Sequence, residues 1–316
     1  MRLIRHLDDF TSDLRGGAVS VGNFDGVHLG HARIIGRLMR SARAAGGPAI
    51  AFTFDPHPAV LLRPDHVPPP LTTTERKAEL LGRLGVDAVI AYPTDHRFLG
   101  LSAHDFFNHI LVDALGARAV VEGPNFFFGH DRRGNVEVLA RFCSEASIDF
   151  QVVEPYDAEG QIVSSSRTRK CLAEGRVEQV AAMLTEPYRV HGMVVHGAGR
   201  GASLGFPTAN VDMVPTLLPC EGIYAGRGYV EGQSVPAAIS LGPNPTFDEG
   251  RRKLEVFLLD FEGDLYGQLI EIDFLARLRD VERYNSVDDL LQQMHRDVEA
   301  TRRIVQQAQE SFRVPS

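Results

Sequence analysis

The chain has 316 residues, of which 44% are hydrophobic, with a formal net charge of −8 at pH 7. This length suggests two domains, each large enough to bury a hydrophobic core of its own. The acidic balance disfavours a nucleic-acid-binding protein that depends on overall basicity.

The first residues, MRLIRHLDDF, carry charges throughout and contain no apolar run of the kind found in a secretory signal. No stretch of the sequence approaches the roughly 20 apolar residues needed to span a bilayer. Cys143, Cys171 and Cys220 are odd in number and far apart. This pattern favours reduced thiols over a disulfide framework, and we expect a cytoplasmic protein without a membrane partner.

Residues 17 to about 156 alternate short apolar runs with helix-like segments. The runs are almost continuously apolar, as expected for strands covered on both faces of a parallel sheet. Residues 29–47 have helical periodicity and end at Gly46–Gly47, and Thr72 with Glu75 forms a capping-box pattern for the next helix. The alternation predicts a doubly wound, Rossmann-like α/β domain over residues 1–186. The predicted strands are 18–24, 49–54, 86–92, 117–123 and 149–156.

After Pro187 the pattern changes to short runs rich in β-branched and aromatic residues, separated by Gly- and Pro-rich turns. This texture predicts a small antiparallel barrel or sandwich over residues 187–316. The chain then continues into an amphipathic helix from about Ser286 to Gln309. The expected apolar face of this helix consists of Leu290, Leu291, Met294, Val298 and Ile304.

A histidine pair follows the first predicted strand, in the segment GNFDGVHLGH (22–31). Open α/β sheets bind ligands at the carboxyl ends of their strands, beside a helix N-terminus. His28 and His31 are three residues apart, so one helical turn can direct both imidazoles at the same anion. Gly30 between them leaves room for a phosphate or a base to approach the backbone. The segment therefore predicts a phosphate-binding site.

A second candidate site is a glycine-rich stretch that leads into PTAN (207–210). The sequence contains no G-x-x-x-x-G-K-[ST], which excludes a P-loop kinase. Glycines let backbone N–H groups wrap phosphates, and a Thr hydroxyl with an Asn amide can hold Mg²⁺. The glycines of this candidate phosphate loop are Gly197, Gly199, Gly201 and Gly205.

The segment GNFDGVHLGH resembles the nucleotidyltransferase signature of the bacterial bifunctional riboflavin kinase/FAD synthetase family, and the resemblance continues along the whole chain. Several separate motifs occur in the order found in that family, which makes the match specific. The further adenylyltransferase motifs are TFDPHP (53–58), NFFFG (125–129) and SSSRTR (164–169). The kinase motifs are GRGASLGFPTAN (199–210), GIYA (222–225), NPTF (244–247) and LEVFLLDF–GDLYG (254–267).

The resemblance implies that residues 1–186 adenylylate FMN with ATP and release pyrophosphate. His28 and His31 are then expected to contact the ATP phosphates near the α-position. Asn125 resembles the family's polar residue on the flavin or phosphate side. The other residues expected to bind or shape the ATP and phosphate site are Gly22, Asn23, Phe24, Asp25, Gly30, Ser164, Ser165, Arg167 and Arg169.

For residues 187–316 the resemblance implies a riboflavin kinase, which makes FMN from riboflavin and ATP. Thr208 and Asn210 are expected to hold Mg²⁺, and Glu255 takes the position of the general base. Two positions depart from the family's usual pattern. Ala202 replaces a basic residue of the glycine-rich loop, and Val281 replaces an acidic residue, so the affinity of the kinase for nucleotide or flavin is in question.

Three alternatives remain. One is a related nucleotidyltransferase that acts on another phosphate, such as a pantetheine or nicotinamide nucleotide, but it leaves residues 187–316 unexplained. A flavin-binding regulator without catalysis is disfavoured by the joint presence of His28, His31, Thr208, Asn210 and Glu255. A tRNA-charging enzyme is disfavoured by the short, acidic chain. A homo-oligomer is left open.

Overall fold

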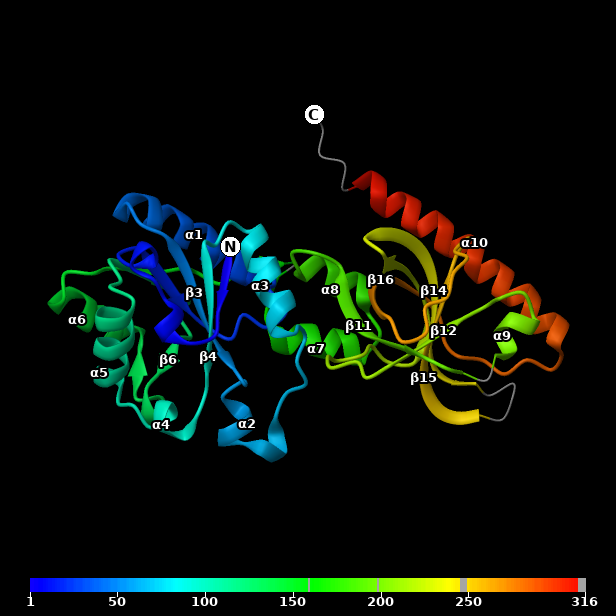
Figure 1. Ribbon diagram of the computed structural model, residues 1–316, viewed down its shortest axis with the longest axis horizontal. Coiled ribbons are helices and arrows are strands. Elements are labelled where there is room, and N and C mark those ends of the chain that lie inside the picture. Colours follow the sequence, from blue (N-terminus) through cyan, green and yellow to red (C-terminus); the bar gives the residue numbers. More distant parts are fainter. Residues whose placement is uncertain (159, 198, 245–248, 312–316) are drawn as a thin grey trace. The chain divides into compact units, whose positions relative to one another are not determined.

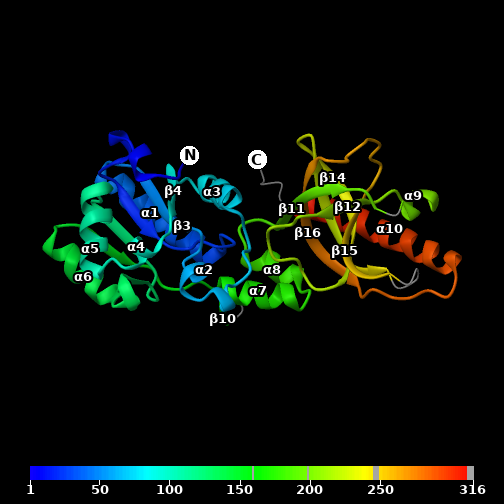
Figure 2. The ribbon, with the colours of Figure 1, turned by 60° about the horizontal axis from the view of Figure 1, so that its bottom comes forward.

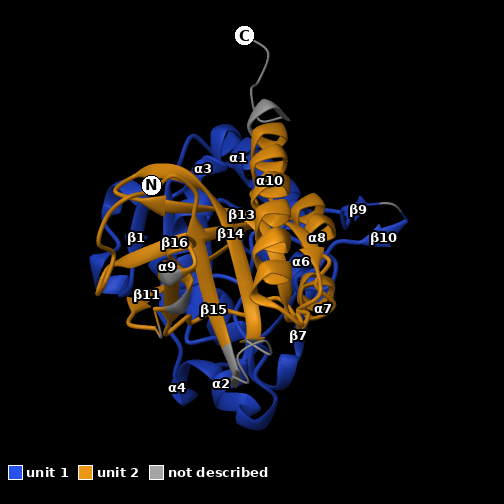
Figure 3. Cartoon of the chain, turned by 90° about the vertical axis from the view of Figure 1, so that its right-hand side faces the viewer, with its two compact units in different colours: residues 1–165 blue, residues 166–316 orange. Residues whose placement is uncertain are grey.

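The computed structural model describes residues 1–158, 160–197, 199–244 and 249–311. Most of the NPTF motif, at positions 245–247, lies outside the described residues. The chain divides into two compact units, residues 1–165 and 166–316 (Figure 3). The second unit therefore includes the two helices before residue 184, except for the first residue of the first helix, together with the strands that follow. The domain boundary expected between residues 186 and 187 remains a prediction.

The first unit contains a six-stranded parallel sheet with the order β1-β4-β3-β2-β5-β8 (Figure 1). From β2 the chain first adds strands on one side and then crosses to β5 on the other. The loop after β2 therefore lies at the point where the strand order reverses, the usual ligand position in such sheets. The strands are β1 (Arg2–Ile4), β2 (Ala18–Val21), β3 (Ala49–Asp55), β4 (Ala88–Pro93), β5 (Ala119–Glu122) and β8 (Asp149–Val152).

Helices cover both faces of this sheet, which confirms the predicted doubly wound fold. Alternate residues of the strands belong to two separate hydrophobic cores, as expected for a pleated sheet buried on both sides. One core includes α1 and α3, and the other includes the π-helix and α6 (Figure 1). The helices are α1 (Leu29–Ala45), α2 (Ala59–Leu62), α3 (Thr74–Arg83), α4 (His96–Leu99), α5 (Ala103–Asp105), the π-helix (Phe106–Ala114) and α6 (Val136–Glu145). Short 3₁₀ turns occur at Leu7–Asp9, Ser12–Leu14, Pro64–His66 and His130–Arg132, and the two-stranded sheets pair β6 (Phe127–Phe128) with β7 (Gly134–Asn135) and β9 (Asp157–Ala158) with β10 (Gln161–Ile162).

Helix α1 ends as predicted, whereas the capping prediction for α3 is wrong. Gly46 closes α1 in the left-handed conformation with φ of 67°, which glycine adopts without strain. At α3 the N-cap is Thr73, whose hydroxyl accepts from the Arg76 N–H at 3.3 Å. The hydroxyl of Thr72 is instead hydrogen-bonded to Asp25, 47 residues earlier in the sequence.

The second unit is built on a closed antiparallel barrel with the order β11-β12-β15-β14-β13-β16. This result decides between the barrel and the sandwich left open by the sequence. The barrel closes because β16 pairs with both β11 and β13. The strands are β11 (Tyr188–Val195), β12 (Ala209–Asp212), β13 (Gly222–Val230), β14 (Gln233–Asn244), β15 (Glu249–Leu258) and β16 (Leu269–Arg279).

Helix α10 (Val287–Ser311) runs alongside the barrel and packs against β13, β14 and β16 (Figure 2). The five residues predicted for its apolar face are half-buried. Its fully buried positions instead include Asp297, Thr301 and Val305. The remaining helices of this unit are α7 (Ser165–Ala173), α8 (Val177–Met183) and α9 (Arg200–Ser203).

Candidate functional site

The turn between β2 and α1 has a strained backbone. Phe24 and Val27 both have positive φ values, of 46° and 40°, in the left-handed region that residues other than glycine rarely adopt. Both side chains are buried in the core beneath the turn, with 2% and 0% of their surface exposed. Strain of this kind persists only where the surroundings fix the conformation, and it is concentrated at functional sites.

Asp25 is one of the groups that fix this turn. Its carboxylate is buried and accepts hydrogen bonds from the backbone N–H groups of Leu71 and Thr72 and from the Thr72 hydroxyl, all at 3.0–3.1 Å. The same hydroxyl accepts from the Gly26 N–H at 3.2 Å. These contacts hold the loop around Asp25 in place, and the role of Asp25 at the ATP site stays a prediction.

His28 and His31 lie against each other at the start of α1. Their rings stack with centroids 3.6 Å apart. His28 is the N-cap residue, and its Nδ1 accepts from the backbone N–H of His31 at 3.3 Å. In a neutral imidazole this bond leaves the proton on Nε2, so His28 can donate one hydrogen bond to a ligand. The Nδ1 atom of His31 is buried without a hydrogen-bond partner among the described residues.

Burial favours the neutral form of both histidines. Burial lowers the pKa of His28 to about 4, although the negative charge of Asp25 acts in the opposite direction. Burial also lowers the pKa of His31 well below its usual value, and the positive charges of His28 and Lys77 lower it further. Two neutral imidazoles offer N–H donors, and no formal charge, to an anion at this end of the helix.

Two glycines of the motif lie close to neighbouring aromatic rings. A Cβ atom on Gly30 would lie 3.0 Å from Nδ1 and Cε1 of His28, which is tighter than almost all real contacts. A Cβ atom on Gly22 would lie 3.3 Å from the ring of Phe24. A larger residue at position 30 would therefore press against the His28 ring. The sequence suggested a different role for Gly30, that of leaving room for a ligand.

The other residues predicted for this site fall in three places. Ser165 donates to the backbone carbonyl of Asp25 at 2.9 Å, so the structure brings it to the turn, and Ser164 directly precedes it. Asn125 is exposed in the turn after β5, the strand beside β2. Arg167 and Arg169 lie on α7 in the second unit and are half-buried.

Two buried ionisable residues near the turn were not found from the sequence. Lys77 on α3 is 7% exposed, and its ammonium group donates to the Thr53 hydroxyl at 3.3 Å. Glu122 at the end of β5 is 3% exposed and accepts from the Val21 N–H at 2.6 Å. Burial raises the pKa of Glu122 well above its usual value. In sequence both look like ordinary charged positions, and no local pattern reveals their burial.

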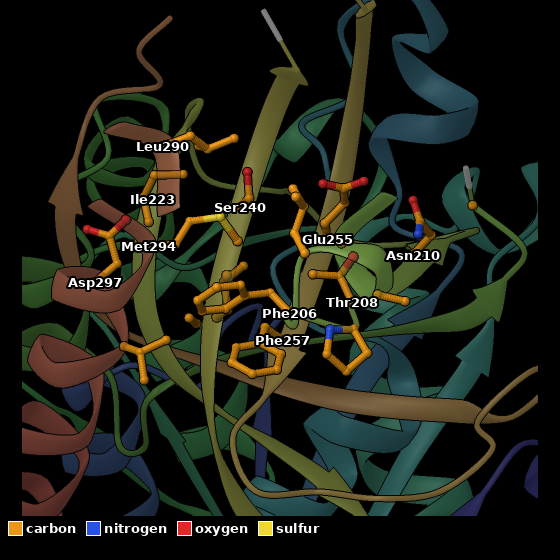
Figure 4. A pocket seen from close by; sticks show the side chains of 18 of the residues that line it. Phe206, Thr208, Asn210, Ile223, Ser240, Glu255, Phe257, Leu290, Met294 and Asp297 are labelled. Atoms are coloured by element: carbon orange, nitrogen blue, oxygen red, sulfur yellow. The ribbon is translucent and has the colours of Figure 1, made fainter. Parts of the chain in front are cut away.

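The second unit contains a cavity of about 220 Å³ between the barrel and α10 (Figure 4). The candidate kinase residues Thr208, Asn210 and Glu255 all line it, on the side opposite Leu290 and Met294 (Figure 4). The structure therefore gathers residues that are up to 47 positions apart in the sequence. The predicted loop residues Gly197, Gly199 and Gly201 also line the cavity. The fourth loop glycine, Gly205, is exposed to solvent.

The register of the barrel explains why these side chains meet. Glu255 on β15 is directly opposite Asn210 on β12 and directly opposite Ser240 on β14. Paired residues of neighbouring strands point to the same face, so the three side chains form a row that faces the cavity. Thr208 lies two residues before Asn210 and shares its face, because side chains alternate along an extended chain.

The glycine-rich loop packs closely against these side chains. A Cβ atom on Gly197 would lie 2.1 Å from Nδ2 of Asn210. On Gly201 it would lie 2.3 Å from the Phe206 carbonyl oxygen and 3.2 Å from the hydroxyl of Thr208. Gly199 has φ of 69° and Gly205 has φ of 85°, conformations that favour glycine. The glycines thus let the loop backbone lie directly over the two predicted Mg²⁺ ligands.

The opposite wall of the cavity carries an ion pair that the sequence did not reveal. Arg279 at the end of β16 donates to Asp297 of α10, with Nη2 and Oδ2 2.8 Å apart. Both residues are largely buried and both line the cavity. The two departures from the family pattern, Ala202 and Val281, line it as well, so their changed chemistry faces the site directly.

Two family models match the chain in sequence order. The model of FAD synthetase matches residues 10–167, and the model of riboflavin kinase matches residues 184–305. The first range contains the histidine-pair turn and the second contains the barrel cavity. The fold and the two sites thus define a nucleotidyltransferase joined to a flavokinase.

Curated relatives resemble the chain over nearly its whole length. The bifunctional riboflavin kinase/FMN adenylyltransferase of Pseudomonas fluorescens is 35% identical over 303 residues, which cover 96% of this chain and 97% of the relative. The protein of the same name from Escherichia coli strain K12 is 34% identical over 94% and 96%. The chain belongs to the bifunctional riboflavin kinase/FMN adenylyltransferase family, which confirms the resemblance seen in its motifs.

A solved structure supports the same fold. It is described as a macrolide-efflux protein from Streptococcus pneumoniae, with 31% identity, a TM-score of 0.85 and coverage of 95% of this chain and 98% of that chain. In the described part of this chain, every helix is too short or too polar to cross a bilayer.

Proposed function

We propose that the cavity of the second unit phosphorylates riboflavin with ATP, and that the histidine-pair site of the first unit adenylylates the resulting FMN to FAD. The enzyme is a transferase of flavin biosynthesis with riboflavin kinase and FMN adenylyltransferase activities, and its substrates are riboflavin, FMN and ATP. The proposal assigns each reaction to named side chains. The kinase reaction is placed in residues 187–316 and the adenylyl transfer in residues 1–186.

Phosphoryl transfer needs a base and a phosphate clamp. Glu255 accepts the proton of the ribityl 5′-hydroxyl as that oxygen attacks the γ-phosphorus of ATP, and ADP leaves. The backbone of the glycine-rich loop binds the phosphates. Thr208 and Asn210 offer a hydroxyl and an amide oxygen, hard ligands that fit Mg²⁺. When bound, Mg²⁺ neutralises the charge that develops on the phosphates.

Adenylyl transfer needs no covalent help from the protein. The FMN phosphate attacks the α-phosphorus of ATP in line, and pyrophosphate leaves. The task of the site is to hold two polyanions together and to stabilise the developing charge. The neutral His28 and His31 donate N–H groups to the phosphates. Arg167 and Arg169 are proposed to bind the departing pyrophosphate, since a guanidinium matches phosphate geometry.

The observation that carries the proposal is the row of Asn210, Glu255 and Ser240 on one face of the barrel, because it places a carboxylate beside a predicted Mg²⁺ ligand. The cytoplasmic location and a possible homo-oligomer remain predictions. The three cysteines are free thiols, as a reducing compartment would allow.

One time course tests the assignment. Full-length protein is incubated with riboflavin, ATP and Mg²⁺, and FMN and FAD are separated chromatographically. We expect FMN to rise first and FAD to follow. FMN that accumulates without FAD would contradict the adenylyltransferase site, and the absence of both products would contradict the whole proposal.

A further inference from the structure

Lys77 is a charged side chain in the interior of the first unit, and the proposed reaction does not yet use it. It lies on α3 and is 7% exposed. Burial lowers the pKa of its ammonium group, while the charges of Asp25 and Asp55 act in the opposite direction. Removing a cation from water costs free energy unless specific contacts offset the loss, so a buried lysine needs an explanation.

The contacts of Lys77 lead directly to the histidine-pair turn. Its Nζ donates to the Thr53 hydroxyl at 3.3 Å, and that hydroxyl donates to the backbone carbonyl of Asn23 at 3.2 Å. Thr53 is completely buried on β3. Asn23 directly precedes Phe24, where the backbone enters its strained conformation. An ammonium, a hydroxyl and a carbonyl thus form a short chain that fixes the first half of the turn.

The second half of the turn is held from the same side. Thr72, two residues before α3, bonds Asp25 and the Gly26 N–H as described above. The α3 segment therefore holds the turn at two points, at Thr72 and at Lys77. The turn ends at His28, so both holds lie within five residues of the histidine pair.

Lys77 also acts on the histidine pair through its charge. Its ammonium group is close enough to His31 to lower the pKa of that imidazole, in addition to the effects of burial and of His28. A neutral His31 avoids a buried charge. The same lysine therefore supports both the shape of the turn and the neutral state of its histidines.

We propose that Lys77 is a positioning residue for adenylyl transfer, which holds the Asn23 carbonyl through Thr53 and thereby places His28 and His31. The proposal rests on the adenylyltransferase function proposed above for the same site. A reaction can slow by about 10²-fold when a preorganised group moves by an ångström. The loss of this chain of contacts should therefore lower kcat.

The test uses the full-length protein and its two activities. Lys77→Met keeps an unbranched side chain, shorter by one atom, but removes the charge and the donors. Thr53→Val keeps the shape of the threonine but removes the hydroxyl, and Thr53→Ser restores it.

We expect Lys77→Met and Thr53→Val each to lower the kcat of FAD formation from FMN roughly 10- to 100-fold. The KM for ATP should change less than kcat, and riboflavin phosphorylation should stay at the wild-type rate. Arg83→Met, on the exposed side of the same helix, is the matched control and should change neither activity.

The double variant Lys77→Met/Thr53→Val decides whether the two residues act as one unit. Residues that act through each other are non-additive, so we expect the double variant to be no slower than the slower single variant. Multiplied losses would overturn the proposal, as would equal loss of both activities or unchanged FAD formation in Lys77→Met. If Lys77→Met does not fold, unchanged FAD formation in Thr53→Val overturns it alone. A wild-type protein that makes no FAD from FMN would instead contradict the proposed function.

Discussion

Asn210 on β12 and Glu255 on β15 stand directly opposite each other across neighbouring strands of the barrel (Figure 4). Opposed side chains on one face have Cβ atoms about 4.5–5.5 Å apart, so the Glu255 carboxylate and the Asn210 amide are close neighbours. The proposed base and a proposed Mg²⁺ ligand are thus fixed by backbone pairing, and flexible loops do not set their separation. Rigid placement of this kind favours proton transfer in the transition state.

Glu255→Gln should nearly abolish riboflavin phosphorylation. Glutamine keeps the size of the side chain but cannot accept a proton at neutral pH, and the loss of a general base typically costs about 10²–10⁴-fold. Supplying FMN directly should bypass the block, because the histidine-pair site uses FMN as its own substrate. Parallel assays from riboflavin and from FMN measure the two outcomes. Unchanged phosphorylation would refute Glu255 as the base and leave solvent, or another carboxylate such as Asp260, to take the proton.

Gly197→Ala should also affect only the kinase. The new methyl group would occupy the position of the Asn210 amide, which lies 2.1 Å from it, so the amide must move. Because the displaced group is the end of a side chain, the barrel should still fold. We expect riboflavin phosphorylation to fall roughly 10- to 100-fold. FAD formation from FMN is the internal control, and wild-type phosphorylation would show that Asn210 is not needed in its present position.

The sequence predicted the strand, the turn and the helix around the histidine pair because their signals are local. A continuous apolar strand, a turn and a helix with His28 and His31 three residues apart lie within 28 positions. The kinase site was reached through motif resemblance. Its geometry depends on pairing between β12, β14 and β15, which are distant in sequence, and periodicity does not reveal such register.

The wrong helix-cap prediction at Thr72 and the missed burial of Lys77 and Asp297 have the same physical origin. Thr72 looked like a helix cap, but a contact with Asp25, far away in sequence, takes its hydroxyl. Lys77 and Asp297 lie on amphipathic helices, where charged residues usually face water. Their burial depends on partners contributed by strands, Thr53 of β3 in one case and Arg279 of β16 in the other. Such non-local partners carry no short-range sequence pattern.

The histidine pair should make the stability of the protein fall on mild acidification. The folded pKa of His28, about 4, lies below its unfolded value near 6.5. The unfolded chain therefore takes up a proton between these values that the folded protein does not. This contribution to stability is complete above about pH 6.5 and is lost progressively as the pH falls toward 4.

His28→Asn isolates this effect, because asparagine is a good N-cap residue that does not titrate. Urea unfolding followed by circular dichroism at pH 7.5 and at pH 5 compares the two proteins. Between pH 7.5 and pH 5, we expect the free energy of unfolding of the wild type to fall by on the order of 2 kcal/mol more than that of the variant. Equal losses in both proteins would show that His28 is not buried in its neutral form.

His28→Ala should lower FAD formation from FMN by roughly 10²–10³-fold, the usual loss for one preorganised contact to a transition state. The substitution removes the Nε2–H donor and also the acceptor that caps α1, so the stability of the variant must be measured. His28→Asn keeps a cap without the imidazole donor and is the matched control. If the imidazole contacts the phosphates, both variants should be slow, although only His28→Ala loses the cap.

Riboflavin phosphorylation should stay near the wild-type rate in both, because the barrel cavity lies in the other unit. A folded His28→Ala protein that loses both activities together would contradict two independent sites. Full activity in His28→Asn would show that the cap, and not the imidazole, is what adenylyl transfer requires.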